Sequence, residues 1–314
     1  MKYIGKRLLQ LIPILIGITF LSFAMMRIAG SDAVEEMYNV RESAVSEQVI
    51  EAKRAELGLD RPFLVQYGSW LIGILHGDMG KSYISGRDVF MTFLSKLRAT
   101  LLLSVLSLGL TVLISIPLGI LAAVRQGRLT DKVLRGLSFL GNAMPGFFTA
   151  MVVMEIFGLK LNLLPVISTG VNLKSAILPA LTLAISMSAK YLRQVRAAVL
   201  EELNKDYIKG LKSRGISDRI ILWKNVMRSA SLTIITLLAL SIGSLLGGTA
   251  IIESIFMWDG VGKLAIDAIN MRDYPIILAY VMWMAIIFVV VNLVTDIIYH
   301  FMDPRIRLGE GEDS

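Results

Sequence analysis

The stretch ATLLLSVLSLGLTVLISIPLGILA at residues 99–122 contains no charged side chain. It is longer than the roughly 18 to 20 residues that a helix needs to cross a bilayer. Comparable apolar runs recur along a chain that is 55% hydrophobic and only 18% charged. The sequence therefore predicts an all-α integral membrane protein with six transmembrane helices. We expect them at residues 8–28, 99–122, 134–157, 176–192, 231–252 and 275–300.

Lysine and arginine gather in alternate loops and give the expected orientation. More than half of the 32 basic residues lie before residue 8, at 125–135, at 190–228 and at 305–307. The short loops between these groups carry few. Because basic loops stay in the cytoplasm, both termini are predicted to be cytoplasmic. The basic start and first apolar run resemble a signal peptide, but no convincing small-residue cleavage site follows, so residues 8–28 are read as a retained span.

Charge and composition exclude several classes of function. The net charge of +7 mostly reflects the cytoplasmic bias of the loops, so nucleic acid is a poor candidate partner. The chain has no cysteine, which excludes disulfides and thiolate metal sites. Its two histidines, His76 and His300, are far apart and expected near opposite faces, so no metal site is predicted. The 16 methionines suit the filling of apolar helices better than a metal relay.

Residues 29–98 form a translocated segment that is near neutral. Helical spacing over residues 45–57, with Gly58 as a stop and Pro62 beyond it, predicts a short helix. The apolar run at 63–75 is too short to span, and its Tyr67 and Trp70 favour an interfacial or re-entrant helix. In the same segment Gly80-Lys81-Ser82 is similar to a phosphate-binding loop, but the required first glycine would fall at Leu75, so no nucleotide site is predicted.

A polar, basic loop at residues 201–218 lies between two predicted spans on the cytoplasmic side, where a soluble partner could push. Gly215 is expected to separate two helical stretches. In the second stretch Ile216, Ile220, Trp223 and Met227 recur at helical spacing and form one predicted apolar stripe. The periodicity alone leaves a second interpretation open, a basic amphipathic helix that rests on anionic lipid.

Several motifs, in order and at similar spacing, resemble the permease subunits of bacterial ATP-binding-cassette (ABC) importers for dipeptides, oligopeptides and nickel. The resemblance extends over nearly the whole chain. The motifs are Glu56-Leu57-Gly58-Leu59-Asp60-Arg61-Pro62 with Gln66-Tyr67, the loop from Asp206 to Gly215, the run from Gly247 to Gly262, Arg272-Asp273-Tyr274-Pro275, and Asp303-Pro304-Arg305.

The resemblance implies the type I ABC importer transmembrane-domain fold, with cytoplasmic coupling helices, in the inner (cytoplasmic) membrane of a bacterium. The implied partners are a second homologous permease subunit, two cytoplasmic ATPase subunits, an extracytoplasmic substrate-binding protein and membrane lipid. The chain itself is then not an enzyme and carries no cofactor. ATP and Mg are expected in the ATPase subunits.

The resemblance also assigns the cytoplasmic loop a role in coupling to the ATPase. Gly215 corresponds to the glycine of the family's coupling motif, although the Glu-Ala-Ala of that motif is replaced by Lys209-Gly210-Leu211. The implied coupling residues are Asp206, Tyr207, Arg214, Gly215, Ile216, Asp218 and Arg219.

Ionisable residues near the spans are candidates for gating or for the transport pathway, because a charge at mid-bilayer costs about 2.5 kcal/mol or more. Glu253 and Trp258 lie where the family's outer gate loop begins. Glu155, near the outer end of the third span, is a further candidate, with a hydrated interfacial carboxylate as the alternative. Asp296 is expected to pack against cytoplasmic basic residues such as Arg193 or Arg196.

The expected organisation is a transmembrane helix at 1–28, an extracytoplasmic segment at 29–98, a five-helix permease core at 99–300 with a coupling loop at 193–230, and a cytoplasmic tail at 301–314. Resemblance of the run 248–275 and of the tail favours nickel, as ion or chelate, as the cargo. The alternative is a dipeptide or oligopeptide permease. A secondary transporter is a less favoured class, because no inverted repeats are evident, and no nucleophile and base can be paired for an intramembrane protease.

Overall fold

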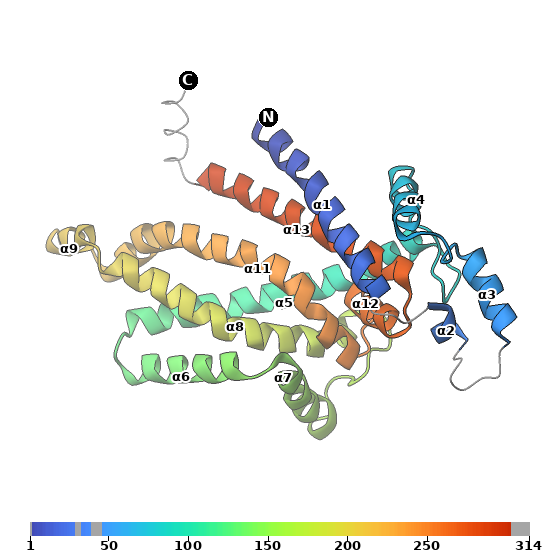
Figure 1. The fold of residues 1–314 in the computed structure, drawn as a ribbon. Helices are drawn as coiled ribbons and strands as arrows, with labels where there is room; N and C mark the ends of the chain where they lie inside the picture. Colours follow the sequence, from blue (N-terminus) through green and yellow to red (C-terminus); the bar gives the residue numbers. More distant parts are fainter. Residues whose placement is uncertain (1, 29–32, 39–45, 303–314) are drawn as a thin grey trace. The chain divides into compact units, whose positions relative to one another are not determined.

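The computed structural model describes residues 2–28, 33–38 and 46–302, and these residues form helices joined by loops (Figure 1). Their helices, with the π-helices labelled η, are α1 (Lys2–Ile28), α2 (Ala33–Met37), α3 (Glu47–Glu56), α4 (Phe63–Leu75), α5 (Val89–Val124), α6 (Leu129–Ala143), α7 (Gly146–Val153), η1 (Met154–Lys160), α8 (Leu173–Leu203), α9 (Asp206–Ser213), α10 (Asp218–Ile220), η2 (Ile221–Val226), α11 (Met227–Ile255), α12 (Val261–Asn270) and α13 (Tyr274–Met302).

Helices cover all six ranges in which spans are predicted. Three of them are long and apolar enough to cross a membrane within the described residues: Val89–Val124, Leu173–Leu203 and Tyr274–Thr295. A fourth joins them if the bent pair α6 and α7–η1 is counted as one span. The mostly helical, membrane-type fold is therefore confirmed.

The third predicted span, at 134–157, differs from one continuous helix. The chain bends by 108° between Leu129–Ala143 and Gly146–Lys160. The cause is Pro145, which has no N–H to donate and which forces the preceding Met144 into an extended conformation (ψ 128°). Pro117 and Pro179 lie inside α5 and α8 without ending them.

The chain divides into two compact units. Unit 1 comprises residues 1–101 and 259–289, and unit 2 comprises residues 102–258 and 290–314. Unit 1 contains α1 to α4, the start of α5, α12 and most of α13. Its core gathers around buried Met79, Val89, Ala268, Ile276, Ala279 and Met282.

Two short helices of unit 1 occupy the segment at residues 29–98. The helix predicted at 45–57 is confirmed as α3, although Val45 lies outside the described residues. Gly58 ends it in the left-handed conformation (φ 68°), as predicted. The apolar run 63–75 is helix α4. Its buried Tyr67 hydroxyl donates to the carbonyl oxygen of Ile16 at 3.2 Å, which attaches α4 to α1.

In unit 2, α8 packs against both α6 and α11 (Figure 1). Close contact between α8 and α5 requires a glycine: a Cβ at Gly119 would lie 2.7 Å from Cβ of Val195. At one end of unit 2, residues of α5, α8, α9, η2 and α11 form a common apolar cluster, here called the anchor cluster. Its buried members are Ile120, Ala123, Val195, Val199, Ile208, Ile221, Val226, Ala230 and Ile234.

Candidate functional site

The candidate coupling segment, residues 206–219, lies where α8 ends and the chain returns toward α11 (Figure 1). Helix α9 begins at Asp206, directly after the turn that ends α8, and runs for only two turns to Ser213. Helix α10 follows from Asp218 and continues into the π-helix η2 and then α11. The predicted division into two helical stretches on either side of Gly215 is thus present in the structure.

The turn at Gly215 ends α9 through two backbone hydrogen bonds. The N–H of Gly215 donates to the carbonyl oxygen of Lys212 at 2.9 Å, and the N–H of Ile216 donates to that of Leu211 at 3.2 Å. This is the Schellman arrangement, and it needs a left-handed residue at Gly215 (φ 75°). Leu211 and Ile216 both pack against the anchor cluster. The turn therefore fixes the orientation of α10 relative to α9 and is itself packed on the anchor cluster.

Ile208 fixes α9 to the long helices of unit 2. Its side chain is 2% exposed and belongs to the anchor cluster, with Val195 and Val199 of α8 and Ile120 of α5. Because interiors are closely packed, a displacement of α9 must move these neighbours with it. The arrangement is suited to carrying a movement from the surface into the helices.

The apolar stripe predicted at Ile216, Ile220, Trp223 and Met227 is divided in the structure, because Ile216 and Met227 alone pack against the anchor cluster. Ile220 and Trp223 are exposed, whereas Ile221 and Val226 are buried in the anchor cluster. The physical reason is the π-helix η2, whose wider turn brings residues five apart onto the same face. Spacing of three and four residues does not apply there.

A polar network joins the start of α9 to the end of α8. The hydroxyl of Tyr207 donates to Oε1 of Glu202 at 2.7 Å, and Nζ of Lys205 donates to Oε2 of the same carboxylate at 2.5 Å. Partial burial of the ring, together with the hydrogen bond to Glu202, raises the pKa of Tyr207 to about 12. Tyr207 therefore stays a neutral hydrogen-bond donor at neutral pH. Sequence analysis missed Glu202 and Lys205, although both lie within five residues of Tyr207.

The remaining coupling candidates present charge at the surface. Asp206 pairs with Lys209 at 2.8 Å, and Asp218 pairs with Lys212 at 3.1 Å. Arg214 and Arg219 are exposed. Exposed ion pairs contribute little to stability, so these charges can exchange their partners for those of another protein at low cost.

The structure brings two of the three gating candidates together. Glu253 and Trp258 are both fully buried at the carboxyl end of α11, where the N–H of Trp258 donates to the carbonyl oxygen of Glu253 at 2.7 Å. The turn between them places Met257 at φ 52°, an uncommon conformation for a residue with a side chain. Glu155 is different. It lies in η1, is exposed, and pairs with Lys160 at 3.5 Å.

A buried ion pair that sequence analysis missed links α6 to α8. Asp131 accepts two hydrogen bonds from the Arg196 guanidinium, at 2.7 and 2.8 Å, and its carboxylate is 1% exposed. Asp296 is expected from the sequence to pack against basic residues such as Arg193 or Arg196, but its side chain lies outside the described residues. The signal was available, because Asp131 is the only acidic residue in the basic stretch 125–135.

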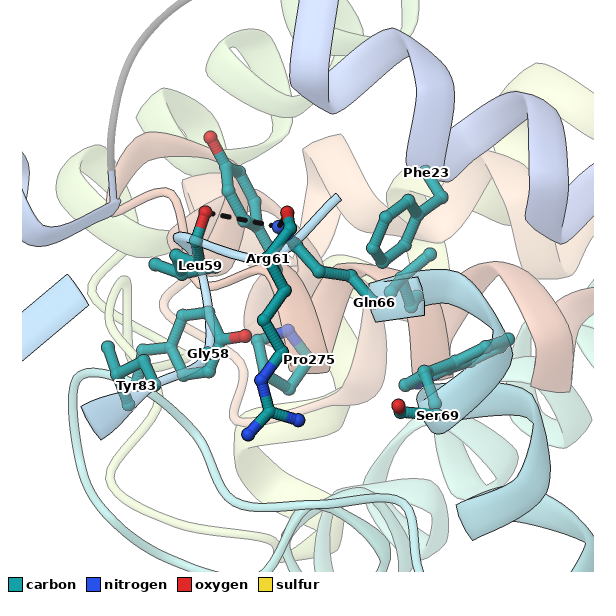
Figure 2. Close-up of a pocket in the computed structure, with 12 residues that line it drawn as sticks. Phe23, Gly58, Leu59, Arg61, Gln66, Ser69, Tyr83 and Pro275 are labelled. Carbon is teal, nitrogen blue, oxygen red and sulfur yellow. Dashed lines mark hydrogen bonds between the residues drawn. The ribbon is translucent and has the colours of Figure 1, made fainter. Parts of the chain in front are cut away.

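Unit 1 contains a small cavity of 140 Å³ where two of the sequence motifs meet (Figure 2). Its lining includes Arg61 and Gln66 from one motif and Tyr274 and Pro275 from the other. Nε2 of Gln66 donates to the carbonyl oxygens of Leu59 and Arg61 at 3.1 and 2.7 Å, which sets the loop (Figure 2).

Asp273 fixes the second motif to the loop that precedes α5. Its carboxylate accepts hydrogen bonds from the hydroxyl of Ser82 at 2.5 Å and from the N–H of Tyr83 at 3.0 Å. Burial, with the nearby Asp273 charge as a smaller cause, raises the pKa of Tyr83 to about 12. The hydrogen bond to Asp273 thus gives the side chain of Ser82 a structural role, with a partner 191 residues later in the chain.

Metal ligands do not gather in the part of the chain that the structure describes. No group of three His, Cys, Asp or Glu side chains there is arranged to hold a metal ion. Nδ1 of His76, the residue that follows α4, lies 2.8 Å from the carbonyl oxygen of Ile72 in that helix. The side chain of His300 lies outside the described residues.

Comparisons with known proteins cover nearly the whole chain. Residues 115–308 match the family model of the binding-protein-dependent transport system inner membrane component, and residues 1–104 match the model of its N-terminal region. The oligopeptide transport system permease protein AppB of Bacillus subtilis is 38% identical over 97% of this chain and 99% of its own length. The nickel import system permease protein NikB of Staphylococcus aureus is 36% identical (99% and 93%), and the glutathione transport system permease protein GsiC of Salmonella typhi is 34% identical (98% and 99%).

Solved structures resemble the fold. The inward-facing MetNI methionine ABC transporter covers 68% of this chain and 97% of its own, with a TM-score of 0.55 and 14% identity. An amino acid ABC transporter crystallised with histidines covers 69% of this chain and 94% of its own, with a TM-score of 0.52 and 18% identity. At these identities the likeness concerns the fold alone.

Proposed function

Because the chain belongs to the binding-protein-dependent transport system inner membrane components, as an ABC importer permease of the peptide and nickel family, we propose that residues 206–219 couple it to a cytoplasmic ATPase. The observation that carries this proposal is the anchor cluster. It joins a short surface helix, through Ile208, to three long helices of the same unit. A partner that grips α9 thereby acts on α5, α8 and α11 together.

The proposed coupling residues divide into two roles. Asp206, Arg214, Asp218 and Arg219 are exposed and supply charges for contact with the ATPase. Tyr207, Gly215 and Ile216 hold the segment in shape, through the Glu202 hydrogen bond and the turn at Gly215. ATP and Mg bind in the ATPase subunits. Closure of these subunits shifts the permease between its inward-facing and outward-facing states.

The proposed assembly has six spans in this chain, with both termini cytoplasmic, and a second homologous permease that completes the pore. Two ATPase subunits bind on the cytoplasmic side, and a substrate-binding protein delivers cargo on the other. The basic loops support this orientation, because the coupling segment lies within the most basic of them, residues 190–228. Glu253 and Trp258 are proposed to act at the outer gate, and Glu155 is proposed as a pathway residue.

The proposed cargo is nickel, as ion or chelate, with dipeptides or oligopeptides as the second candidate. Relatives named for nickel, oligopeptide and glutathione transport match over nearly the whole chain at similar identity, which supports both candidates. Selectivity is proposed to reside largely in the binding protein. A permease without a cluster of metal ligands in its described residues is compatible with either cargo.

ATP hydrolysis by the purified complex in lipid tests the proposal. Binding protein loaded with nickel or a nickel chelate is compared with binding protein loaded with short peptides. Stimulation by the metal-loaded protein alone supports nickel, and stimulation by the peptide-loaded protein alone replaces nickel by peptide. Absence of a copurifying ATPase would contradict the coupling role.

A further inference from the structure

A basic groove lies between α6 and α8 in unit 2, outside the coupling segment. The two helices run in opposite directions and touch at Gly141, where a Cβ would lie 2.9 Å from Cβ of Ala189. Near the other end of α6, the Asp131–Arg196 ion pair joins them. A groove of 530 Å³ opens beside these contacts, and its lining is Lys132, Arg135, Gly136, Phe139, Arg193 and Arg196.

The charge of the groove is strongly positive. Within the described residues, Arg196 is the one lining cation that forms an ion pair, and Asp131 neutralises it. Lys132, Arg135 and Arg193 are exposed and face no carboxylate at ion-pair distance among those residues. Three like charges around one groove repel one another, so an anion between them is favoured. Arginine also presents a planar pair of donors that matches a phosphate group.

The surface beside the groove is apolar. Leu129, Val133, Leu137 and Leu140 of α6 are exposed at spacings of four, four and three, which places them along one side of the helix. The exposed ring of Phe139 lines the groove itself. A free phosphate would satisfy only the cations. A ligand with an anionic head and an apolar tail satisfies both surfaces.

We propose that this groove binds the phosphate headgroup of an anionic phospholipid, whose acyl chains lie along the apolar side of α6. In the proposed orientation, residues 125–135 and 190–228 lie at the cytoplasmic face, where basic pockets between membrane helices meet anionic headgroups. Gly136 has no atom within 4 Å of the position of a Cβ, so it leaves room for the headgroup. Arg196 stays with Asp131 and sets the distance between the helices.

The test is a lipid titration of the delipidated complex, followed by native mass spectrometry with phosphatidylglycerol, phosphatidylcholine or inorganic phosphate as the probe. We expect phosphatidylglycerol to bind in preference to phosphatidylcholine. Its affinity is expected to fall about fivefold for each cation removed in Lys132→Gln, Arg135→Gln and Arg193→Gln. Removing the same number of charges in Lys81→Gln, Arg87→Gln and Lys174→Gln, which are exposed and lie outside the groove and the coupling segment, should leave the affinity unchanged.

A second variant separates shape from charge. Gly136→Leu fills the groove without altering its charge and should also weaken phosphatidylglycerol binding. Gly109→Leu, at a position in α5 where a Cβ likewise meets nothing within 4 Å, is its control. Unchanged phosphatidylglycerol binding in both Gly136→Leu and the triple groove variant would overturn the proposal, as would binding of inorganic phosphate alone. Because lipid retention is measured without transport, failure of the coupling role leaves this test intact.

Discussion

The backbone conformation of Gly215, and not the space around it, restricts which residues can replace it. Its φ of 75° lies in the region that costs a residue with a Cβ about 1–2 kcal/mol. A side chain there would meet no atom within 4 Å, so crowding is not the obstacle. Substitution at Gly215 therefore tests the geometry of the turn itself.

Gly215→Val is expected to leave the permease in the membrane and to uncouple ATP hydrolysis from uptake. The reason is that valine disfavours the left-handed conformation of the turn that connects α9 to α10. Gly215→Asn should retain coupling, since asparagine tolerates this conformation. The measurement is the ratio of cargo imported to ATP hydrolysed in proteoliposomes. Normal coupling by the valine variant would remove Gly215 from the coupling mechanism.

Glu253 is buried at the end of α11 next to Trp258, and we expect its carboxyl group to matter for gating. Glu253→Gln keeps the shape of the side chain and should lower the rate of uptake while the complex still assembles. Glu51→Gln is the matched control, because Glu51 of α3 is exposed and belongs to none of the proposed sites. Uptake rates in proteoliposomes and gel filtration of the complex decide the outcome. Equal rates for both variants and the parent would exclude a gating role for Glu253.

At the scale of elements, Ile208 is the fully buried side chain of α9 in the anchor cluster, and Leu211 packs against the same cluster. A helix of two turns is not stable by itself in water, so tertiary packing must hold it. Ile208 provides that packing within the anchor cluster, and the π-helix η2 adds Ile221 and Val226. This packing would let α9, as the proposed coupling helix, move together with α5, α8 and α11.

Ile208→Ala and Ile220→Ala remove the same atoms from sites of opposite burial. Ile208 is 2% exposed and Ile220 is 47% exposed. The first is expected to destabilise its surroundings by about 2–5 kcal/mol and to reduce uptake per ATP hydrolysed. The second should change stability by no more than about 0.5 kcal/mol. Thermal unfolding in detergent and the coupling ratio check both effects. Loss of stability in Ile208→Ala with an unchanged ratio would limit Ile208 to a structural role.

At the scale of the whole molecule, the proposed orientation in the membrane is open to a direct test because the chain contains no cysteine. A single introduced cysteine is then the only thiol. Lys209→Cys should react with a membrane-impermeant maleimide only after the membrane is opened. Asp60→Cys, in the segment predicted to be extracytoplasmic, should react in intact spheroplasts. The reverse pattern would invert the proposed orientation.

The features that depend on local chemistry could be predicted from the amino-acid sequence. Apolar length located the helices, glycines at Gly58 and Gly215 marked the ends of α3 and α9, and the motifs identified the family. Each of these signals is contained in a short stretch of the sequence. Hydration of the backbone and the φ preference of glycine act at that range, so no tertiary information was needed.

The contacts that join distant residues could not be predicted from the sequence and required the three-dimensional structure. The Asp131–Arg196 pair, the attachment of Asp273 to Ser82, and the burial of Ile221 and Val226 in place of Ile220 and Trp223 depend on packing. A π-helix changes which residues share a face, and a bend at Pro145 divides an apolar run whose length predicts one span. Periodicity assumes a regular helix, and ion pairing depends on which helices become neighbours. Neither the regularity of a helix nor the identity of its neighbours can be predicted from the local sequence.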